Sequence, residues 1–589
     1  MKRMISLALV LMLTVSLLPA VHAGAAPAVS SNIDDHFYIN AQRWTDPIRS
    51  TLAWEDGGFL RVEAIGETLV VERYDAGFQF LSGQEIPLEL PLYGGVYLCD
   101  DYNFLVVGQE NYEEDDAKEV FRIIRYTKDW QKVDHASLFG ANTTVPFDAG
   151  CCRFDRCGDI LYIRTAHEMY ASEDGYNHQA NVMIAVRISD MTVTDELTKV
   201  WNNGYGYVSH SFNQFVRVDG DKLLAVDHGD AHPRSVCLFQ YPNSASSESF
   251  YGPTTMVNAL PIVDSTYHYN DTGVSVGGFE FSSTDYLIAG CSYDQVLEAD
   301  LSSVHRNIFV TATPKDDFTD EATVVHWLTD FTADDDVTVS PPHLLKLDAD
   351  RFFLTWTENG VLKYCLLNGK GEPDGEIRSG TGNLSDCQPI MVEGRAVWYV
   401  TDNSAPVFYE IDPDNPFTDV GPREFYYEPV LWAVENGITT GATPTTFNPL
   451  GQCQRAQVVT FLWRATGEPE PATTVNPFED VKEGKFYYKA VLWAVENGIT
   501  NGLDATHFGP YAYCNRAQVV TFLWRSVGHP GTDSTHTSFT DVKDGEFYYE
   551  AVLWAVENSI TNGMSDTEFG VNAICNRAQI VTFLYRAFA

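Results

Sequence analysis

Short apolar runs separated by turn residues fill the chain between residues 32 and 412. Runs such as YNFLVVGQ, EVFRIIRY and DILYIRTA are rich in valine, isoleucine and aromatic residues, and no convincing amphipathic helical stretch interrupts them. Runs of this kind, bounded by turns, are typical of strands. A unit recurs in which a strand, a turn such as Asp219-Gly220 and a more apolar strand follow one another. The pattern therefore predicts an all-β domain over residues 32–412.

The recurring unit also indicates an architecture. About seven units begin near Gly58, Gly95, Gly150, Phe212, Gly277, Pro342 and Gln388. Units of roughly 40–65 residues with several strands each are typical of β-propeller blades. We expect a seven-bladed β-propeller, with a pair of β-sandwiches as the alternative because the spacing is uneven.

The pattern becomes helical after the proline-broken segment at 412–416. In YYKAVLWAVENGI (487–499), apolar residues stand at positions 488, 491, 492 and 495, which is the stripe of an amphipathic helix. Asn497-Gly498 follows the stripe as a C-terminal cap. This part of the chain is predicted to be all-α.

Residues 413–589 contain three copies of one sequence unit. Equivalent residues recur every 61 positions: Phe417, Phe478 and Phe539; Trp432, Trp493 and Trp554; Arg455, Arg516 and Arg577. Three copies in strict register mark one supersecondary unit used three times. We place the copies at 413–467, 476–528 and 537–589, with EPEPATT and GHPGTDSTH between them.

The phrase CNRAQVVTFLWR (514–525) predicts the start of a second helix in each copy. Asn515 is a good N-cap and Gln518 completes a capping box. Arg516 stands in the first turn, where a cation opposes the helix dipole at a cost of a few tenths of a kcal/mol or more. A cost repeated three times indicates that the arginine is held for another purpose. The alternative is a structural ion pair with an aspartate such as Asp480.

Phe-x-Asp, a tryptophan-bearing helix, Gly-Ile-Thr-x-Gly and an Arg-Ala-Gln helix start together resemble S-layer homology (SLH) domains over about residues 413–589. The resemblance implies a pseudo-threefold prism of helices. It also implies grooves that bind a secondary cell-wall polysaccharide, often with an acidic pyruvyl ketal. It implies anchoring at the cell wall of a bacterium.

The family's polysaccharide-binding positions map onto the repeated residues. They are Arg455, Arg516, Arg577, Asp419, Asp480, Asp541, Trp432, Trp493, Trp554, Gly441, Gly502 and Gly563. A guanidinium fork suits a carboxylate, tryptophan offers a flat face to a sugar ring, and glycine permits close approach of the backbone.

Some positions depart from the family pattern, so the three grooves are not expected to be equal. Gln454 is a weak N-cap, and Ser559 replaces the glycine found at 437 and 498. Gly570-Val571 stands where copy one has Asn448-Pro449. The cysteines at 453, 514 and 575 are interpreted as buried packing residues, with activated thiolates beside the arginines as the alternative.

Charge and the N-terminus narrow the class of protein. The net charge of −43 disfavours nucleic acid and anionic membranes as partners. Residues 1–23 combine a basic start, an apolar stretch and Val21-His22-Ala23, which is typical of a secretory signal. A retained anchor is the alternative, and no later stretch is long enough to span a membrane. The eleven cysteines are scattered and form no zinc motif. We expect a secreted protein with no cofactor or metal.

A histidine cluster raises a competing hypothesis for the β domain. The candidate catalytic residues are His167, His210, His228, Asp230, His232 and Arg234, and His178 lies nearby. Such residues can act as a general base or hold an oxyanion, but no catalytic motif frames them. Our first hypothesis is a wall-anchored protein that displays a propeller-like binding domain with an unknown ligand. The others are a wall-anchored enzyme and a purely structural surface-layer component.

Overall fold

The computed structural model describes residues 26–33, 45–201, 203–263, 272–293, 295, 305–332 and 334–589. The chain divides into two compact units, Met1–Glu410 (unit 1) and Ile411–Ala589 (unit 2). The predicted signal segment lies outside the described residues. Each unit is described by itself.

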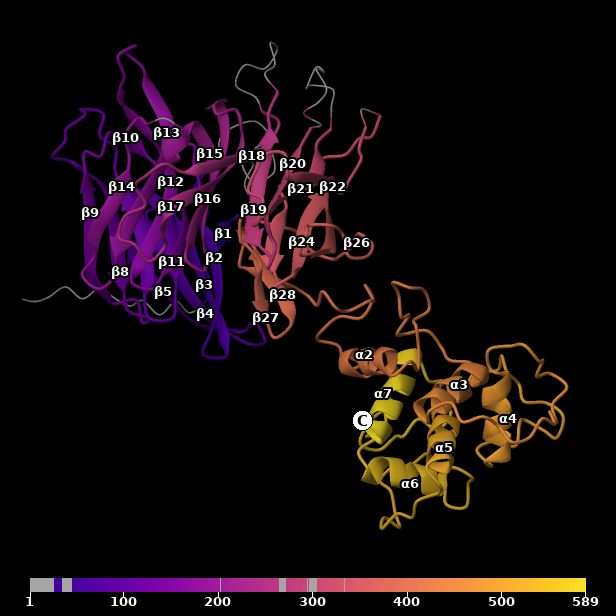
Figure 1. The fold of residues 1–589 in the computed structure, drawn as a ribbon. Helices are drawn as coiled ribbons and strands as arrows, with labels where there is room; N and C mark the ends of the chain where they lie inside the picture. The colour runs from indigo at the N-terminus through magenta and orange to yellow at the C-terminus, as the bar shows by residue number, and fades with distance from the viewer. Residues whose placement is uncertain are drawn as a thin grey trace, which may run out of the picture. The chain divides into compact units, whose positions relative to one another are not determined.

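Unit 1 is built from strands, in the order shown in Figure 1. Five sheets of three or four strands stand apart in the described residues. They are β2 (Ser50–Glu55), β3 (Gly58–Ile65), β4 (Thr68–Asp75) and β5 (Phe80–Pro87); β6 (Leu92–Leu98), β7 (Asn103–Gly108), β8 (Glu119–Tyr126) and β9 (Lys132–Phe139); β19 (Ser275–Phe281), β20 (Asp285–Ser292), β21 (Asn307–Pro314) and β22 (Val324–Trp327); β23 (His343–Lys346), β24 (Arg351–Glu358), β25 (Val361–Asn368) and β26 (Arg378–Ser379); β27 (Ile390–Val392), β28 (Arg395–Val400) and β30 (Val407–Ile411).

A larger sheet holds nine strands. They are β10 (Thr143–Pro146), β11 (Arg153–Cys157), β12 (Ile160–Ala171), β13 (Asn177–Arg187), β14 (Thr192–Leu197), β15 (Ser209–Asp219), β16 (Lys222–His232), β17 (Ser235–Ser244) and β18 (Thr255–Pro261). The short helix η1 (Asn203–Tyr205) precedes β15, and β1 (Ser30–Ser31) pairs with β29 (Asp402–Ser404). Between β13 and β15 the sheet is joined by one residue pair, Ala180 and Ser209.

One strand from each of the five smaller sheets, together with β11 and β15 of the larger sheet, lies next to its neighbours around the centre of unit 1. β11 contacts β15, β15 contacts β19, β19 contacts β23, and β27 contacts both β23 and β2. The Tyr93 hydroxyl on β6 donates to the Ile48 carbonyl before β2 at 3.2 Å. A Cβ on Gly95 of β6 would lie 2.8 Å from the Phe154 ring of β11, so these strands are also neighbours. The sheets thus surround a common centre, with orange β27 next to indigo β2 (Figure 1).

This arrangement confirms the all-β, propeller-like prediction for unit 1. The count of seven blades is not confirmed, because β10–β18 form one continuous sheet. The core lies between neighbouring sheets. Phe104 of β7 packs with Ile163 and Ile184 of the larger sheet, and none of the three side chains is exposed. Such burial stabilises by about 25 cal/mol per Å² of apolar surface removed from water.

Unit 2 contains six described helices. They are α2 (Tyr427–Glu435), α3 (Arg455–Ala465), α4 (Tyr488–Glu496), α5 (Arg516–Ser526), α6 (Tyr549–Glu557) and α7 (Arg577–Phe588). Helices α3, α5 and α7 contact one another, and each contacts one outer helix: α3 with α4, α5 with α6, and α7 with α2. The helical prediction is confirmed, and each copy packs its second helix against the first helix of the next copy.

A closed ring of backbone hydrogen bonds joins the three copies. The Cys453 N–H donates to the Cys575 carbonyl, Cys575 to Cys514, and Cys514 to Cys453, each at 3.1 Å. The three side chains are fully buried, and burial raises the pKa of each thiol to about 12. A thiol with such a pKa stays protonated at neutral pH, which favours the packing interpretation over the activated thiolate. All eleven cysteines of the chain are free.

Candidate functional site

The repeated arginine is the first residue of the inner helix in each copy. Its backbone N–H does not remain an orphan helix donor, because it bonds a carbonyl of the next copy. Arg455 donates to Ala512 at 2.8 Å, Arg516 to Ala573 at 2.9 Å, and Arg577 to Gly451 at 2.9 Å. The exposed fractions of the three arginines are 2%, 3% and 6%. Each therefore lies buried at a junction between two copies.

The guanidinium group spans the same junction. In Arg516, Nε donates to the Phe569 carbonyl and Nη2 to the Thr561 hydroxyl, both at 2.9 Å. The group also lies 4.9 Å from the centre of the Phe569 ring and 5.3 Å from that of Phe583. Arg455 makes the same hydrogen bonds with Phe508 and Thr500, and Arg577 with Phe447 and Thr439. The arginines of the three junctions therefore make the same set of hydrogen bonds.

No ion pair joins these arginines to a carboxylate anywhere in the part of the chain that the structure describes, so the alternative, a structural ion pair with an aspartate such as Asp480, is not formed. Burial lowers the pKa of each guanidinium, and nearby thiols and aspartates act in the opposite direction. Arginine nevertheless stays charged in proteins. A buried charge without a counter-ion is costly, which makes these junctions suited to an anion.

One guanidinium nitrogen is left over. Because Nε and Nη2 of Arg455 bind the protein, Nη1 is the nitrogen that makes no hydrogen bond to a described residue. This nitrogen is not fully buried, although Arg455 as a whole is only 2% exposed. Nη1 of Arg516 and that of Arg577 are likewise left over and not fully buried.

The repeated aspartates position the arginine's acceptor. Asp480 accepts hydrogen bonds from the backbone N–H groups of Phe508 at 2.9 Å and Gly509 at 2.8 Å. The carbonyl of the same Phe508 accepts from Arg455. Asp419 and Asp541 hold Phe447 and Phe569 in the same way. The Phe508 carbonyl and the Gly509 N–H belong to one peptide unit, so the aspartate holds one end of that unit and the arginine binds the other.

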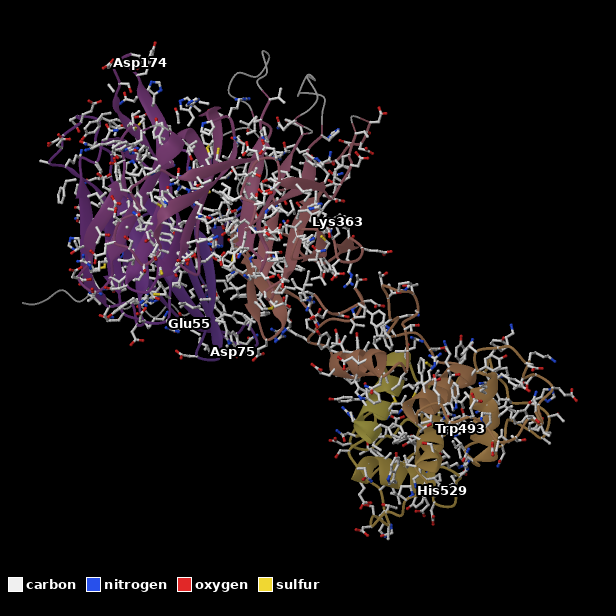
Figure 2. All side chains as sticks on the ribbon, in the orientation of Figure 1. Glu55, Asp75, Asp174, Lys363, Trp493 and His529 are labelled. Atoms are coloured by element: carbon white, nitrogen blue, oxygen red, sulfur yellow. The ribbon has the colours of Figure 1, made fainter. Side chains whose placement is uncertain are left out.

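The repeated glycines and tryptophans pack against protein. Gly502 has φ +84°, and a Cβ there would lie 2.5 Å from the Phe478 ring. Gly441 and Gly563 have equivalent contacts. Trp493, labelled on α4 in Figure 2, is 6% exposed, and Trp554 is 7% exposed. Their rings leave little surface for a sugar, whereas Trp432 is half-buried beside Tyr585.

Sequence reasoning missed the threonines that bind the arginines. Thr439, Thr500 and Thr561 recur at the same 61-residue spacing, and each is nearly fully buried. That spacing, with each threonine directly after an isoleucine and two residues before a glycine, was the available signal. Their partners could not be assigned, because each arginine lies on a different copy from its threonine.

The three junctions also differ in detail. The Gln457 N–H donates to the main-chain carbonyl of Gln454. The equivalent Gln518 N–H instead donates to the side-chain Oδ1 of Asn515, at 2.9 Å. Ser559 has φ +58°, a left-handed conformation that its glycine counterparts adopt without strain. Gln454 makes no side-chain cap, although the Gln457 side chain accepts from the Gln454 N–H at 3.0 Å. That the three grooves bind unequally stays a prediction.

The histidine candidates of unit 1 have separate environments. His167 is buried against Thr143 at 2.6 Å and His228 against Thr272 at 2.7 Å. Burial lowers the pKa of His167 to about 3 and that of His228 to about 4.

The remaining candidates lie at the surface or near it. The His210 ring meets Asp230 at 3.1 Å, and Arg234 donates to the Asp230 carbonyl at 2.6 Å, while His232 is exposed. His178 pairs at 2.8 Å with Asp174, which Figure 2 labels at the end of the β12–β13 hairpin. No group of three or more potential ligands for a metal occurs among the described residues. The structure links His210, Asp230 and Arg234 and gives the two buried histidines other partners.

Comparison with known proteins identifies the repeats. The S-layer homology domain family matches residues 416–459, 477–520 and 538–581. The chain is 38% identical over 96 residues to a surface-layer 125 kDa protein of Lysinibacillus sphaericus and 31% identical over 120 residues to a cell surface protein of Thermoanaerobacter kivui. It is 31% identical over 111 residues to an endoglucanase of Bacillus sp. (strain KSM-635).

These alignments are short. They cover 16%, 20% and 19% of this chain and only 8%, 16% and 12% of the respective relatives.

Because the family matches all three repeats, the chain carries three tandem S-layer homology domains, which indicate a cell-surface protein. None of the described helices combines the length and apolar character that crossing a membrane requires.

Solved structures resemble the chain only weakly. Two prolyl endopeptidases, studied for inter-domain dynamics, give a TM-score of 0.35 at 11% identity, covering 64% of this chain and 49% of theirs. Polysaccharide lyase Uly1 gives 0.35 at 10% identity, with 62% and 90% covered. Apo AztD from Citrobacter koseri gives 0.31 at 10% identity, with 56% and 76% covered. Scores at this level carry no functional argument.

Proposed function

Because the chain carries three tandem S-layer homology domains, we propose that unit 2 anchors it noncovalently to an acidic secondary cell-wall polysaccharide. Unit 1 is then a propeller-like binding domain held at the surface. The observation that carries this proposal is the set of three buried arginines that form no ion pair with a described carboxylate, each with an Nη1 that is not fully buried.

The physical argument is one of charge compensation. A carboxylate of the polysaccharide, such as a pyruvyl ketal, supplies the hydrogen-bonded anion that each junction lacks, since the nearby aspartate acts on the arginine only through its charge. Charge-assisted hydrogen bonds to guanidinium groups are among the stronger ones in proteins, at about 1.5–3 kcal/mol. Three junctions on one unit add avidity, because binding at the second becomes intramolecular. The overall charge of −43 disfavours a polyanion, so the positive charge has to be local.

The test is co-sedimentation of the full chain with purified cell-wall sacculi. The chain is expected to pellet with intact sacculi and to stay in solution once the wall polysaccharide has been stripped. The triple variant Arg455→Gln, Arg516→Gln, Arg577→Gln is expected to lose the interaction. Thermal unfolding and circular dichroism establish that the variant is folded.

The chain offers a matched control. Arg464, Arg525 and Arg586 lie in the last turns of the same three helices and bond carbonyls of Ile438, Ile499 and Ile560. Replacing these three by glutamine removes the same charge from the same helices and is expected to leave wall binding intact. Sedimentation that survives stripping, or that both triple variants lose equally, would count against the proposal.

We further propose that unit 1 has seven blades. The single pair between Ala180 and Ser209 supports dividing the nine-stranded sheet into β11–β14 and β15–β18. The first strand of each resulting sheet then begins within about ten residues of a start expected from the sequence. Export through residues 1–23 remains a prediction.

A further inference from the structure

A pocket lies where the first strands of unit 1 meet. It has about 630 Å³ of space between atoms, counting the part open to solvent. Its lining comes from β11, β15, β19 and β23 and from the segments before β2 and β27. None of the histidine candidates lines it. We propose that this pocket binds a small monocarboxylate that carries hydroxyl groups, with Arg153 and Asn213 as the carboxylate donors.

Arg153 supplies the positive charge. Its guanidinium lies 4.6 Å from the centre of the Phe215 ring. Its Nε is buried without a hydrogen-bond partner, and no ion pair involves Arg153 within the described part of unit 1. That nitrogen is closed off from the pocket, but neither Nη1 nor Nη2 bonds a described residue or is fully buried. The two Nη groups are therefore the donors left for a carboxylate ligand.

Asn213 supplies a second donor, and the backbone is shaped to present it. The pairing of β15 with β16 shifts register between Phe212 and Phe215, which leaves Asn213 in a bulge. Its φ is +45°, a conformation that asparagine tolerates better than most residues. Bulges of this kind redirect side chains beside binding sites. Its Oδ1 accepts the Val276 N–H at 3.1 Å, while its amide donates no hydrogen bond to a described residue.

The remaining walls select the rest of the ligand. His343 donates through Nε2 to the Ser385 carbonyl at 2.8 Å, so Nδ1 is the acceptor of a neutral ring. Burial lowers the pKa of that ring to about 4, which keeps it neutral at pH 7. Asp46 and Asp386 also line the pocket. The charge of Asp386 already acts on Arg153, so the pocket suits at most a singly charged anion, and these polar walls favour a ligand that also carries hydroxyl groups.

The test measures binding of D-glucuronate, D-galacturonate and D-gluconate to the full chain by calorimetry, with D-glucose as the neutral comparison. All measurements use the triple Arg→Gln background of unit 2, so that the wall-binding junctions cannot contribute. At least one acid is expected to bind, and glucose is expected to bind at least about tenfold more weakly.

Two variants and one control locate the site. Arg153→Gln removes the charge, and Asn213→Gly removes the amide while keeping the left-handed backbone. Each is expected to weaken acid binding by roughly tenfold or more. Arg156→Gln changes the same charge on the same strand, at an ion pair with Asp101 outside the pocket, and is expected to have no effect.

The outcomes are distinct. Loss of binding in Asn213→Gly alone supports the proposal even if Arg153→Gln fails to fold. Absence of binding by all three acids, equal affinity for glucose, or unchanged affinity in both variants overturns it. None of these results depends on whether unit 2 binds the cell wall.

Discussion

The two units close their rings in different ways. In unit 2 the same arginine contacts, to a threonine hydroxyl and to a phenylalanine carbonyl, join each copy to the next. In unit 1 the contacts between neighbouring sheets differ from place to place: the Tyr399 hydroxyl of β28 donates to Glu63 of β3 at 2.9 Å, whereas Arg217 of β15 pairs with Glu280 of β19 at 3.0 Å. A repeated interface makes three sites of one kind, whereas a varied one leaves room for a single specialised pocket. The comparison predicts that chemical perturbations act differently on the two units.

The largest difference is expected in acid. His167, His228 and His343 of unit 1 are buried, whereas His507, His529 and His536 of unit 2 are exposed. Burial lowers the pKa of the first three to about 3, 4 and 4, so the folded state binds fewer protons than the unfolded state. Stability is therefore complete above about pH 6.5 and falls as the pH decreases through the range down to the folded pKa values.

At pH 5 each of these histidines is expected to cost unit 1 roughly 2 kcal/mol relative to pH 7. Calorimetric unfolding of the full chain at both pH values measures the effect as a shift of one transition. Replacing His167 by Gln assigns that transition to unit 1. Equal shifts of both transitions would contradict the expected difference.

The next effect is expected at a buried ion pair of unit 1. Arg164 pairs with Asp227 and donates to the Tyr241 hydroxyl at 2.6 Å, with both charged side chains fully buried. Replacing Arg164 by Met leaves a buried carboxylate unpaired and is expected to destabilise unit 1 by about 3–5 kcal/mol. Denaturant unfolding measures the loss.

A surface pair serves as the control for that variant. Arg187 pairs with Asp190 and Glu248, both of which are exposed. Its replacement by Met is expected to change stability little, because water and salt screen exposed pairs. A large effect of Arg187→Met would show that burial is not what distinguishes the two sites.

A smaller effect is expected from the glycine of the repeated turn in unit 2. Gly498 and Gly502 both have positive φ, but a Cβ on Gly498 meets nothing within 4 Å whereas one on Gly502 meets Phe478. Gly498→Ala is expected to cost about 1 kcal/mol for backbone strain. Gly502→Ala is expected to cost a further 1–3 kcal/mol or so for the clash. Equal values from thermal unfolding would mean that the Phe478 ring moves aside freely.

The smallest effect is expected to be stabilising. Ser559 adopts the left-handed conformation in which copies one and two have glycine. Ser559→Gly is expected to stabilise unit 2 by roughly 0.5–1 kcal/mol, since it relieves strain at a helix C-cap. Gly437→Ser, the reverse change in copy one, is expected to destabilise by a similar amount. If the two changes in stability are equal and opposite, local backbone strain accounts for both. If they are unequal, the two copies differ in some other way.

The sequence predicted unit 2 better than unit 1 for a physical reason. The 61-residue repeat singles out Arg516 and Asp480 as candidate site residues from the sequence alone. It does not show that these two side chains form no ion pair. Thr561 was missed because its partner Arg516 belongs to the preceding copy, and only the packing of one copy against the next brings them together.

In unit 1 the alternation of apolar runs predicted strands and a propeller-like arrangement. It could not predict the pocket, because Arg153, Asn213 and His343 come from strands far apart in the chain. A bulge also decides where Asn213 points. Local clustering instead drew attention to His228 and His232, which are near in sequence but differ in burial.

The ring of hydrogen bonds through Cys453, Cys514 and Cys575 has a consequence for assembly. Each copy offers one donor to a neighbour and one acceptor to the other, so every junction is head-to-tail. Head-to-tail contacts form closed rings when the rotation between copies completes a turn, and open filaments when it does not. With three copies on one chain, the turn is completed inside the molecule. A chain deprived of one copy would expose one unmatched donor surface and one unmatched acceptor surface, and would be expected to polymerise with others of its kind.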